Sequence, residues 1–378
     1  MAAAPGGGVF FQRYLHGLRG VAALAVLLFH WEQFFPAAGR WAQQFFPADT
    51  VLDPTIYVGF GWLGVPLFFV LSGLLLGAQV AQADLSGAFL TRFWRRRFFR
   101  IYPAVWLQLI VLLIVATFLP GLISQASYQT LWLQVLLWVN LPPAMASPLN
   151  GVWWTLPVEL GFYVLLPLVG WASQRVGWVS LLVAGLAVTL VWRLWLFSTF
   201  EGDNYQVILT ALDSLPGVLF TFMLGYSLNF LPNPSSERAK WRGLVIALVV
   251  LLALFQWQLT LDAVYWSGHW ILLVWPPMVA VAVAGLVYCL REPPKAFHWL
   301  GTPVFMWWGN ISFGIYLWHF PVMRCLVMIF PESWGSPEMS LLALFVSAAA
   351  TFVLATISFY LVERPLMGWG SRPGHASA

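Results

Sequence analysis

Charged side chains are scarce in this sequence: aspartate, glutamate, lysine and arginine make up 8% of its 378 residues. A soluble globular chain carries about 25%, so a water-soluble fold of this length would lack the charge to cover its surface. Cysteine is nearly absent too: only Cys289 and Cys325 occur, both inside apolar runs, which excludes a secreted disulfide scaffold. Hydrophobic residues make up 61%, which excludes disorder and predicts an all-α polytopic membrane protein.

Motifs for metals and nucleotides are also missing. The chain has no HExxH, CxxC or paired Glu-x-x-His pattern, so we expect no metal, and it has no Walker loop or GxGxxG. Ser72 lies in PLFFVLSGLLL, which is not a G-x-S-x-G elbow, and a hydrolase-type serine triad is therefore not predicted. Ser72 remains a candidate for contacting substrate or supporting the site.

Long apolar runs account for most of the chain. Runs long enough to span a bilayer lie at 15–35, 60–82, 101–119, 151–172, 177–197, 210–230, 243–261, 270–290, 303–330 and 339–362. A further run, 128–140, has about 13 residues, which is short for a crossing and favours a re-entrant or interfacial helix. We therefore expect about ten transmembrane helices plus this short one.

The loop charges predict the orientation. With ten crossings, nearly all loop arginines and lysines fall on the side of both termini, and Arg40 is the only loop cation opposite. The positive-inside rule therefore predicts cytoplasmic termini, with a cytoplasmic tail at 1–14, one transmembrane domain at 15–365 and a second cytoplasmic tail at 366–378. The net charge of +4 then belongs to the cytoplasmic face, and we expect no nucleic-acid partner.

Ionisable residues inside apolar runs are the informative ones, because each is expensive in a bilayer unless paired or hydrated. Arg19 and His30 are eleven residues apart in the first run, which places them within about 20° on one helix face and about 16 Å apart along it. A snorkelling arginine and an interfacial histidine are the alternative. Glu159 has Tyr163 one turn along on the same face, and a structural Glu–Arg pair is the competing interpretation.

A second histidine lies in ISFGIYLWHFPV. Ser312, Tyr316 and His319 follow at i, i+4 and i+7, so their polar groups share a helix face. Pro321 weakens the helix two residues later. A packing histidine and a functional one are equally good interpretations here.

Five arginines precede the third long span: Arg92, Arg95, Arg96, Arg97 and Arg100. Such a run usually anchors topology or binds lipid headgroups. The competing interpretation is a phosphate clamp, because all five are arginine and the guanidinium fork binds phosphate in a bidentate manner.

A histidine base, buried charges and an arginine cluster together would suit acyl transfer from a thioester to a hydroxyl group. A neutral imidazole, with an ordinary pKa near 6.5, can take a proton from a hydroxyl at neutral pH. A thioester suits such a base, because its thiol leaving group has a pKa near 8.5. Coenzyme A carries phosphates that Arg97 and Arg100 could hold while its thin arm reaches towards His30.

The chain resembles the acyltransferase-3 family of integral membrane acyltransferases. The motifs that carry the resemblance occur in order: HGLRGVAALAVLLFH (16–30), PLFFVLSGLLL (66–76), RRRFFRIYP (95–103), WWTLPVELGFYVLLPL (153–168), ISFGIYLWHFPV (311–322) and FYLVERP (359–365). The resemblance implies O-acylation of sugars in O-antigens, exopolysaccharides or similar glycoconjugates, with acyl-CoA, most simply acetyl-CoA, as donor. It also implies the stand-alone form without an SGNH domain.

The resemblance implies roles for single residues. His30 would be the catalytic histidine, Arg19 an essential first-span arginine, and Glu159 the family's recurrent glutamate. Arg97 and Arg100 would form the Arg-x-x-Arg pair that binds acyl-CoA, with Arg96 beside them. Tyr163, Tyr316 and His319 join Ser72 as candidates for substrate contact or support. One departure is His16, where the family commonly has aspartate.

Two further function classes compete with an acyltransferase. The first is a proton-coupled transporter or flippase of a glycan or lipid-linked substrate, with the buried charges as a relay; the absence of an obvious internal repeat counts mildly against it. The second is a membrane scaffold, which would not need buried charge on shared faces. Expected partners are the bilayer of a bacterial inner membrane, acyl-CoA and a carbohydrate or glycolipid acceptor; the oligomeric state is not predicted.

Overall fold

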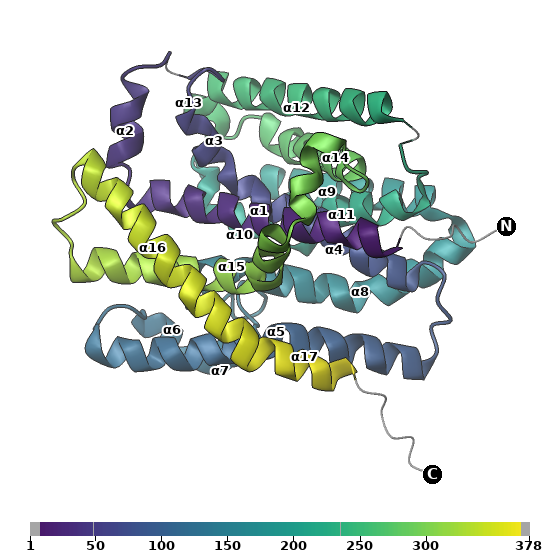
Figure 1. Cartoon of the computed structure of the whole chain (residues 1–378), viewed down its shortest axis with the longest axis horizontal. Coiled ribbons are helices and arrows are strands. Elements are labelled where there is room, and N and C mark those ends of the chain that lie inside the picture. Colours follow the sequence, from purple (N-terminus) through teal and green to yellow (C-terminus); the bar gives the residue numbers. More distant parts are fainter. Residues whose placement is uncertain (1–7, 48, 235, 372–378) are drawn as a thin grey trace, which may run out of the picture. The chain divides into compact units, whose positions relative to one another are not determined.

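The computed structural model describes residues 8–47, 49–234 and 236–371 (Figure 1). The chain divides into two compact units, each built from three segments. Unit 1 comprises Met1–Ala25, Gln43–Gln82 and Leu168–Asn310, and unit 2 comprises Val26–Ala42, Ala83–Pro167 and Ile311–Ala378. All regular structure in the described residues is helical.

Nine helices of the described residues are long and apolar enough to cross a membrane. They are formed around α1 (Gly8–Phe34), α4 (Gly64–Val80), α5 (Gly87–Phe118), α8 (Thr155–Val176), α9 (Trp178–Thr199), α12 (Glu237–Thr260), α14 (Ile271–Leu290), α15 (Pro303–Ile329) and α16 (Pro337–Ser358). A bent pair, α10 (Leu209–Leu212) and α11 (Leu215–Ser227), makes ten if it is one span. The prediction of about ten spans is confirmed.

Shorter helices cap or extend these spans. They are α2 (Ala37–Gln43), α3 (Thr55–Gly59), η1 (Phe60–Leu63), η2 (Gly151–Trp154), η3 (Tyr205–Ile208), η4 (Leu228–Phe230), α13 (Asp262–Tyr265), η5 (Lys295–Gly301), the π-turn η6 (Phe359–Glu363) and α17 (Arg364–Ser371). The predicted short helix at 128–140 is α7 (Leu131–Leu136), preceded by α6 (Gln125–Gln129). Leu137 ends α7 in the left-handed conformation with φ 55°, so the segment is far too short to cross.

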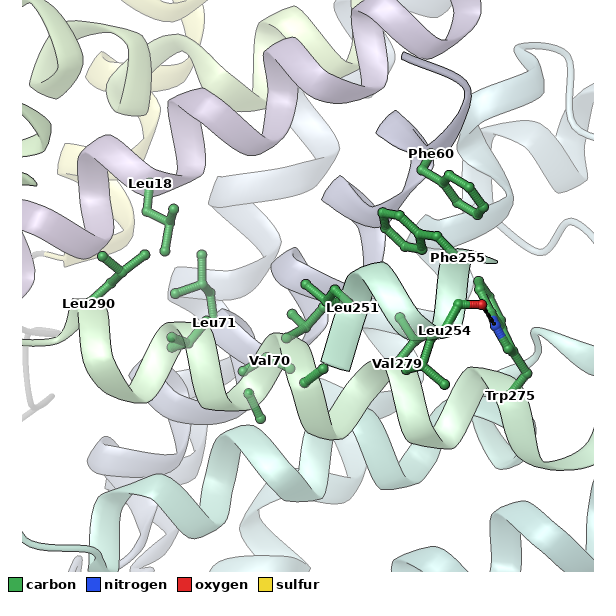
Figure 2. Close-up of a cluster of buried hydrophobic side chains, with 14 of the residues drawn as sticks. Leu18, Phe60, Val70, Leu71, Leu251, Leu254, Phe255, Trp275, Val279 and Leu290 are labelled. Carbon is green, nitrogen blue, oxygen red and sulfur yellow. Dashed lines mark hydrogen bonds between the residues drawn. The ribbon is translucent and has the colours of Figure 1, made fainter. Parts of the chain in front are cut away.

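Unit 1 has a continuous apolar core between α4, α12 and α14 (Figure 2). Phe60 stacks on Phe255 with ring centroids 3.8 Å apart. Trp275 buries its indole but donates its N–H to the Leu254 carbonyl at 2.9 Å, as Figure 2 shows. Its polar atom is therefore satisfied inside an apolar cluster, as a low-dielectric interior requires.

Arg193, which the sequence reasoning did not single out, is buried on α9 with 2% of its side chain exposed. It donates to the Leu272 carbonyl at 3.0 and 3.1 Å and to the Leu212 carbonyl at 3.0 Å. Both carbonyls lie four residues before a proline, Pro276 and Pro216, which has no N–H to offer them. Arg193 thus supplies the missing donors both in α14, at Leu272, and at the break where α10 and α11 bend by 50°, at Leu212.

Unit 2 packs α5 against α17 and the π-turn η6, side by side in Figure 1. Gly314 lets α15 approach α16 closely, because a Cβ there would lie 2.9 Å from Ala355. Trp31, at the end of α1 in this unit, donates its indole N–H to the Ser340 carbonyl of α16 at 2.8 Å. These contacts fix the helices that carry both histidines of interest.

Close contact of α4 with α11 predicts the effect of one added methyl group. A Cβ on Gly225 would lie 2.0 Å from the Val70 carbonyl oxygen, whereas one on Gly285 of α14 would meet Ala247 Cβ at an ordinary 3.6 Å. Gly225→Ala should therefore destabilise the detergent-solubilised protein by about 1–3 kcal/mol. Gly285→Ala, the matched control, should leave the melting temperature unchanged or raise it, since alanine favours helices. Equal melting temperatures for both variants would contradict this packing.

Candidate active site

Most predicted site residues lie in unit 2. They are His30, Arg96, Arg97, Arg100, Glu159, Tyr163, Tyr316 and His319. Arg19 and Ser72 lie in unit 1. Arg19 and His30 nonetheless share the uninterrupted helix α1, as predicted.

The two histidines of unit 2 form a hydrogen-bonded pair. His319 Nε2 lies 3.0 Å from His30 Nδ1, and their ring centroids are 4.9 Å apart. Phe29 and Phe320 meet the His30 ring edge-on, with centroids at 4.9 and 5.3 Å. The sequence reasoning named both histidines but did not predict that they touch.

A polar clamp holds α15 beside His319. The Leu317 carbonyl has lost its main-chain partner because Pro321 carries no N–H. It accepts hydrogen bonds from Gln108 Nε2 at 2.6 Å and Asn150 Nδ2 at 3.0 Å. The Gln108 carbonyl in turn accepts from Asn150 Nδ2 at 3.1 Å and from the Trp153 indole at 2.7 Å.

Gln108 and Asn150 were missed in the sequence reasoning, which considered only ionisable residues in the spans. The sequence carried a signal for both, because Gln108 lies inside an apolar run and Pro321 is the fourth residue after Leu317. Both side chains are buried. An uncharged amide in an apolar span indicates that a backbone carbonyl nearby lacks its main-chain donor. A proline on a neighbouring helix indicates that this carbonyl is the one four residues before the proline.

Tyr316 lies on the same helix face as Ser312 and His319, and all three are buried as predicted for a shared face. Its hydroxyl donates to the Val152 carbonyl at 2.9 Å and shares a hydrogen bond with Thr155 Oγ1 at 2.9 Å. Through these hydrogen bonds Tyr316 joins α15 to the start of α8.

Glu159 and Tyr163 of α8 meet Arg97 of α5. The Tyr163 hydroxyl donates to Glu159 Oε1, which confirms the predicted common face. The Arg97 guanidinium lies 5.9 Å from the Tyr163 ring centroid and 5.5 Å from that of Phe93. Tyr163 is therefore a shared neighbour of the Glu159 carboxylate and the Arg97 guanidinium.

The arginine cluster divides by environment. Arg96 is exposed, while Arg97 and Arg100 are half-buried. Arg100 lies over the Phe313 ring at 5.7 Å and interacts electrostatically with Glu363 of η6. Glu363 is fully buried; its Oε1 accepts from Ser358 at 2.9 Å, and its Oε2 has no hydrogen-bond partner among the described residues. Glu363 lies in the quoted FYLVERP motif, but the sequence reasoning gave it no role.

The two remaining predicted residues stand in unit 1. The Arg19 guanidinium lies 5.9 Å from the Phe68 ring centroid of α4, and Ser72 is one turn further along that helix. His16 hydrogen-bonds through Nε2 to Asn310 Oδ1 at 2.8 Å.

Metal-ligand geometry does not occur in the part of the chain that the structure describes: no three His, Cys, Asp or Glu side chains gather there as a possible ion site. The groups that could hold an organic anion are Arg97 and Arg100 with exposed Arg96. The arrangement in unit 2 thus offers an imidazole, a carboxylate and a cationic surface.

Comparison with known proteins shows the family of this chain. The profile described as "Acyltransferase domain" matches residues 12–360. The chain belongs to the acyltransferase-3 family. The family assignment agrees with the resemblance inferred from the motifs. The apolar helices of the chain make the protein a multi-pass membrane protein.

Individual relatives are distant but aligned over most of the chain. The peptidoglycan O-acetyltransferase OatA of Listeria monocytogenes is 25% identical over 93% of this chain, which spans 55% of that protein. The acyltransferase MdmB of Streptomyces mycarofaciens is 27% identical, with 93% of this chain and 91% of the relative aligned. The putative peptidoglycan O-acetyltransferase YrhL of Bacillus subtilis is 25% identical over 96% of this chain, which spans 56% of it. No solved structure matches the chain.

Removing the acceptor at the centre of the clamp tests its contribution. Gln108→Leu leaves the Trp153 indole and one Asn150 N–H without their acceptor, which should destabilise the protein by about 1–3 kcal/mol per stranded donor. Gln79→Leu on the exposed face of α4 is the matched control and should have little effect. The readout is the melting temperature in detergent. Indistinguishable melting curves for the two variants would refute the clamp.

Proposed function

We propose that this protein transfers an acyl group, most simply acetyl, from acyl-CoA to a hydroxyl group of a carbohydrate or glycoconjugate. The observation that carries the proposal is the His30–His319 pair, whose ring nitrogens lie 3.0 Å apart, in the same unit as the Arg97–Arg100 cluster. Family membership supports acyl transfer, and the names of the relatives support an O-linked acetyl group and a carbohydrate acceptor such as peptidoglycan.

The proposed reaction needs one base. The imidazole of His30 takes the proton of the acceptor hydroxyl, whose oxygen forms a bond to the thioester carbonyl carbon. The carbon–sulfur bond then breaks, and its electron pair leaves on sulfur. The imidazolium returns the proton to the thiolate, so an ester and free coenzyme A form and His30 is neutral again. Glu159 and Arg19 are proposed to orient or polarise the reactants.

Arg97 and Arg100, with Arg96, are proposed to bind the phosphates of acyl-CoA. Arginine suits this role because it makes bidentate, charge-assisted hydrogen bonds to phosphate. The same arginines lie in the first half of helix α5, in a cationic segment that the positive-inside rule assigns to the cytoplasm, where acyl-CoA is found. We accordingly propose cytoplasmic termini in a bacterial inner membrane.

Radiolabelled acetyl-CoA given to membranes tests this function. Label should enter the carbohydrate or glycolipid fraction only when the intact protein is present. Arg97→Ala combined with Arg100→Ala should raise the KM for acetyl-CoA by about tenfold or more, because two charge-assisted contacts are lost. Arg242→Ala, an exposed arginine on α12 of unit 1, is the matched control and should leave KM unchanged. Glycan movement without any acyl transfer would contradict the proposal and favour a transporter.

A further inference from the structure

The protonation of the histidine pair follows from its neighbours. His319 Nδ1 lies 2.9 Å from the Ile315 carbonyl oxygen, which can only accept, so this nitrogen carries a hydrogen. In a neutral ring the other nitrogen, His319 Nε2, then holds a bare lone pair. That lone pair is the atom 3.0 Å from His30 Nδ1.

The neighbours of His30 determine which of its ring nitrogens carries the hydrogen. Its Nδ1 faces two acceptors, the Val26 carbonyl at 3.0 Å and His319 Nε2 at 3.0 Å. Two acceptors can both be satisfied only if Nδ1 carries the hydrogen and shares it between them. His30 Nε2 is therefore the bare nitrogen of the neutral ring, and the hydrogen bond at one nitrogen determines the role of the other.

We propose that His319 is a positioning residue for the reaction: it accepts the His30 Nδ1–H and so presents His30 Nε2 as the nitrogen that takes the proton of the acceptor hydroxyl. This inference rests on the proposed function. It adds which nitrogen reacts and which residue orients it, in the place that a carboxylate occupies in a serine-hydrolase triad.

A neutral orienting partner has a chemical consequence. When His30 takes the proton at Nε2, the pair carries one positive charge in total, and the Nδ1–H bond to His319 becomes charge-assisted. His319 stabilises the imidazolium less than an ionised carboxylate would, so return of the proton to the departing thiolate is easier. The clamp on the Leu317 carbonyl keeps His319 in place, since Leu317 lies two residues before it on α15.

The tautomer can be measured without activity. In the full-length protein in lipid nanodiscs, labelled with ¹⁵N at histidine, the His30 and His319 signals are assigned by their loss in His30→Ala and His319→Phe. Both rings should show a protonated Nδ1 and a bare Nε2. A His30 ring protonated at Nε2 in the wild-type protein would overturn the proposal.

Paired variants at position 319 separate orientation from packing. Glutamine places its amide oxygen near the Nε2 position and can still accept from His30, whereas asparagine reaches only the Nδ1 position. His319→Gln should keep acetyl transfer within about tenfold of wild type, and His319→Asn should lower kcat about 10²-fold with an unchanged Kd for acetyl-CoA. Equal activity of the two variants would contradict the proposal. If His30 is protonated at Nδ1 but the wild-type protein transfers no acetyl group, the proposed function is refuted, whereas the hydrogen-bonded arrangement of His30 and His319 is not.

Discussion

The structure depends on how it satisfies backbone carbonyls that proline deprives of a partner. In an apolar environment an unpaired carbonyl costs several kcal/mol, so a proline inside a span requires a donor from elsewhere. In this chain, side chains donate to four carbonyls that lie four residues before a proline. Arg193 donates to the carbonyls of Leu212 and Leu272, and Trp94 donates to that of Tyr163. Gln108 and Asn150 both donate to the Leu317 carbonyl. The buried side chains of Arg193, Gln108 and Asn150 thus hydrogen-bond to backbone carbonyls.

The same constraint positions candidate site residues in unit 2. Pro321 frees the Leu317 carbonyl, and the amides that bind this carbonyl hold the turn of α15 on which His319 lies. His319 meets His30, and Tyr316 joins the same stretch of helix to α8, which carries Glu159. His30, His319 and helix α8 are therefore connected through hydrogen bonds rather than through apolar packing alone, and such networks hold a unique arrangement.

Apolar run length and charge placement sufficed to predict the helical class, the number of spans and the short segment at 128–140, because bilayer thickness fixes the length of a crossing. They also suggested His30, Glu159 and His319 as candidate site residues, because an ionisable group in a span is expensive. The His30–His319 contact, the bend after Leu212 and the roles of Arg193 and Gln108 were beyond prediction, since each depends on which helices become neighbours. Glu363 lies in a motif that the sequence shows, but the sequence did not predict that this carboxyl group is buried near Arg100.

The central claim is that His30 performs the chemistry while the arginine cluster holds the donor. The most direct measurement compares acetyl-CoA binding with single-turnover acetyl transfer in His30→Ala. The account predicts a Kd within about twofold of wild type and a transfer rate reduced about 10²–10⁴-fold, the range expected when a general base is removed. Transfer at the wild-type rate, or a loss fully explained by weaker binding, would contradict it.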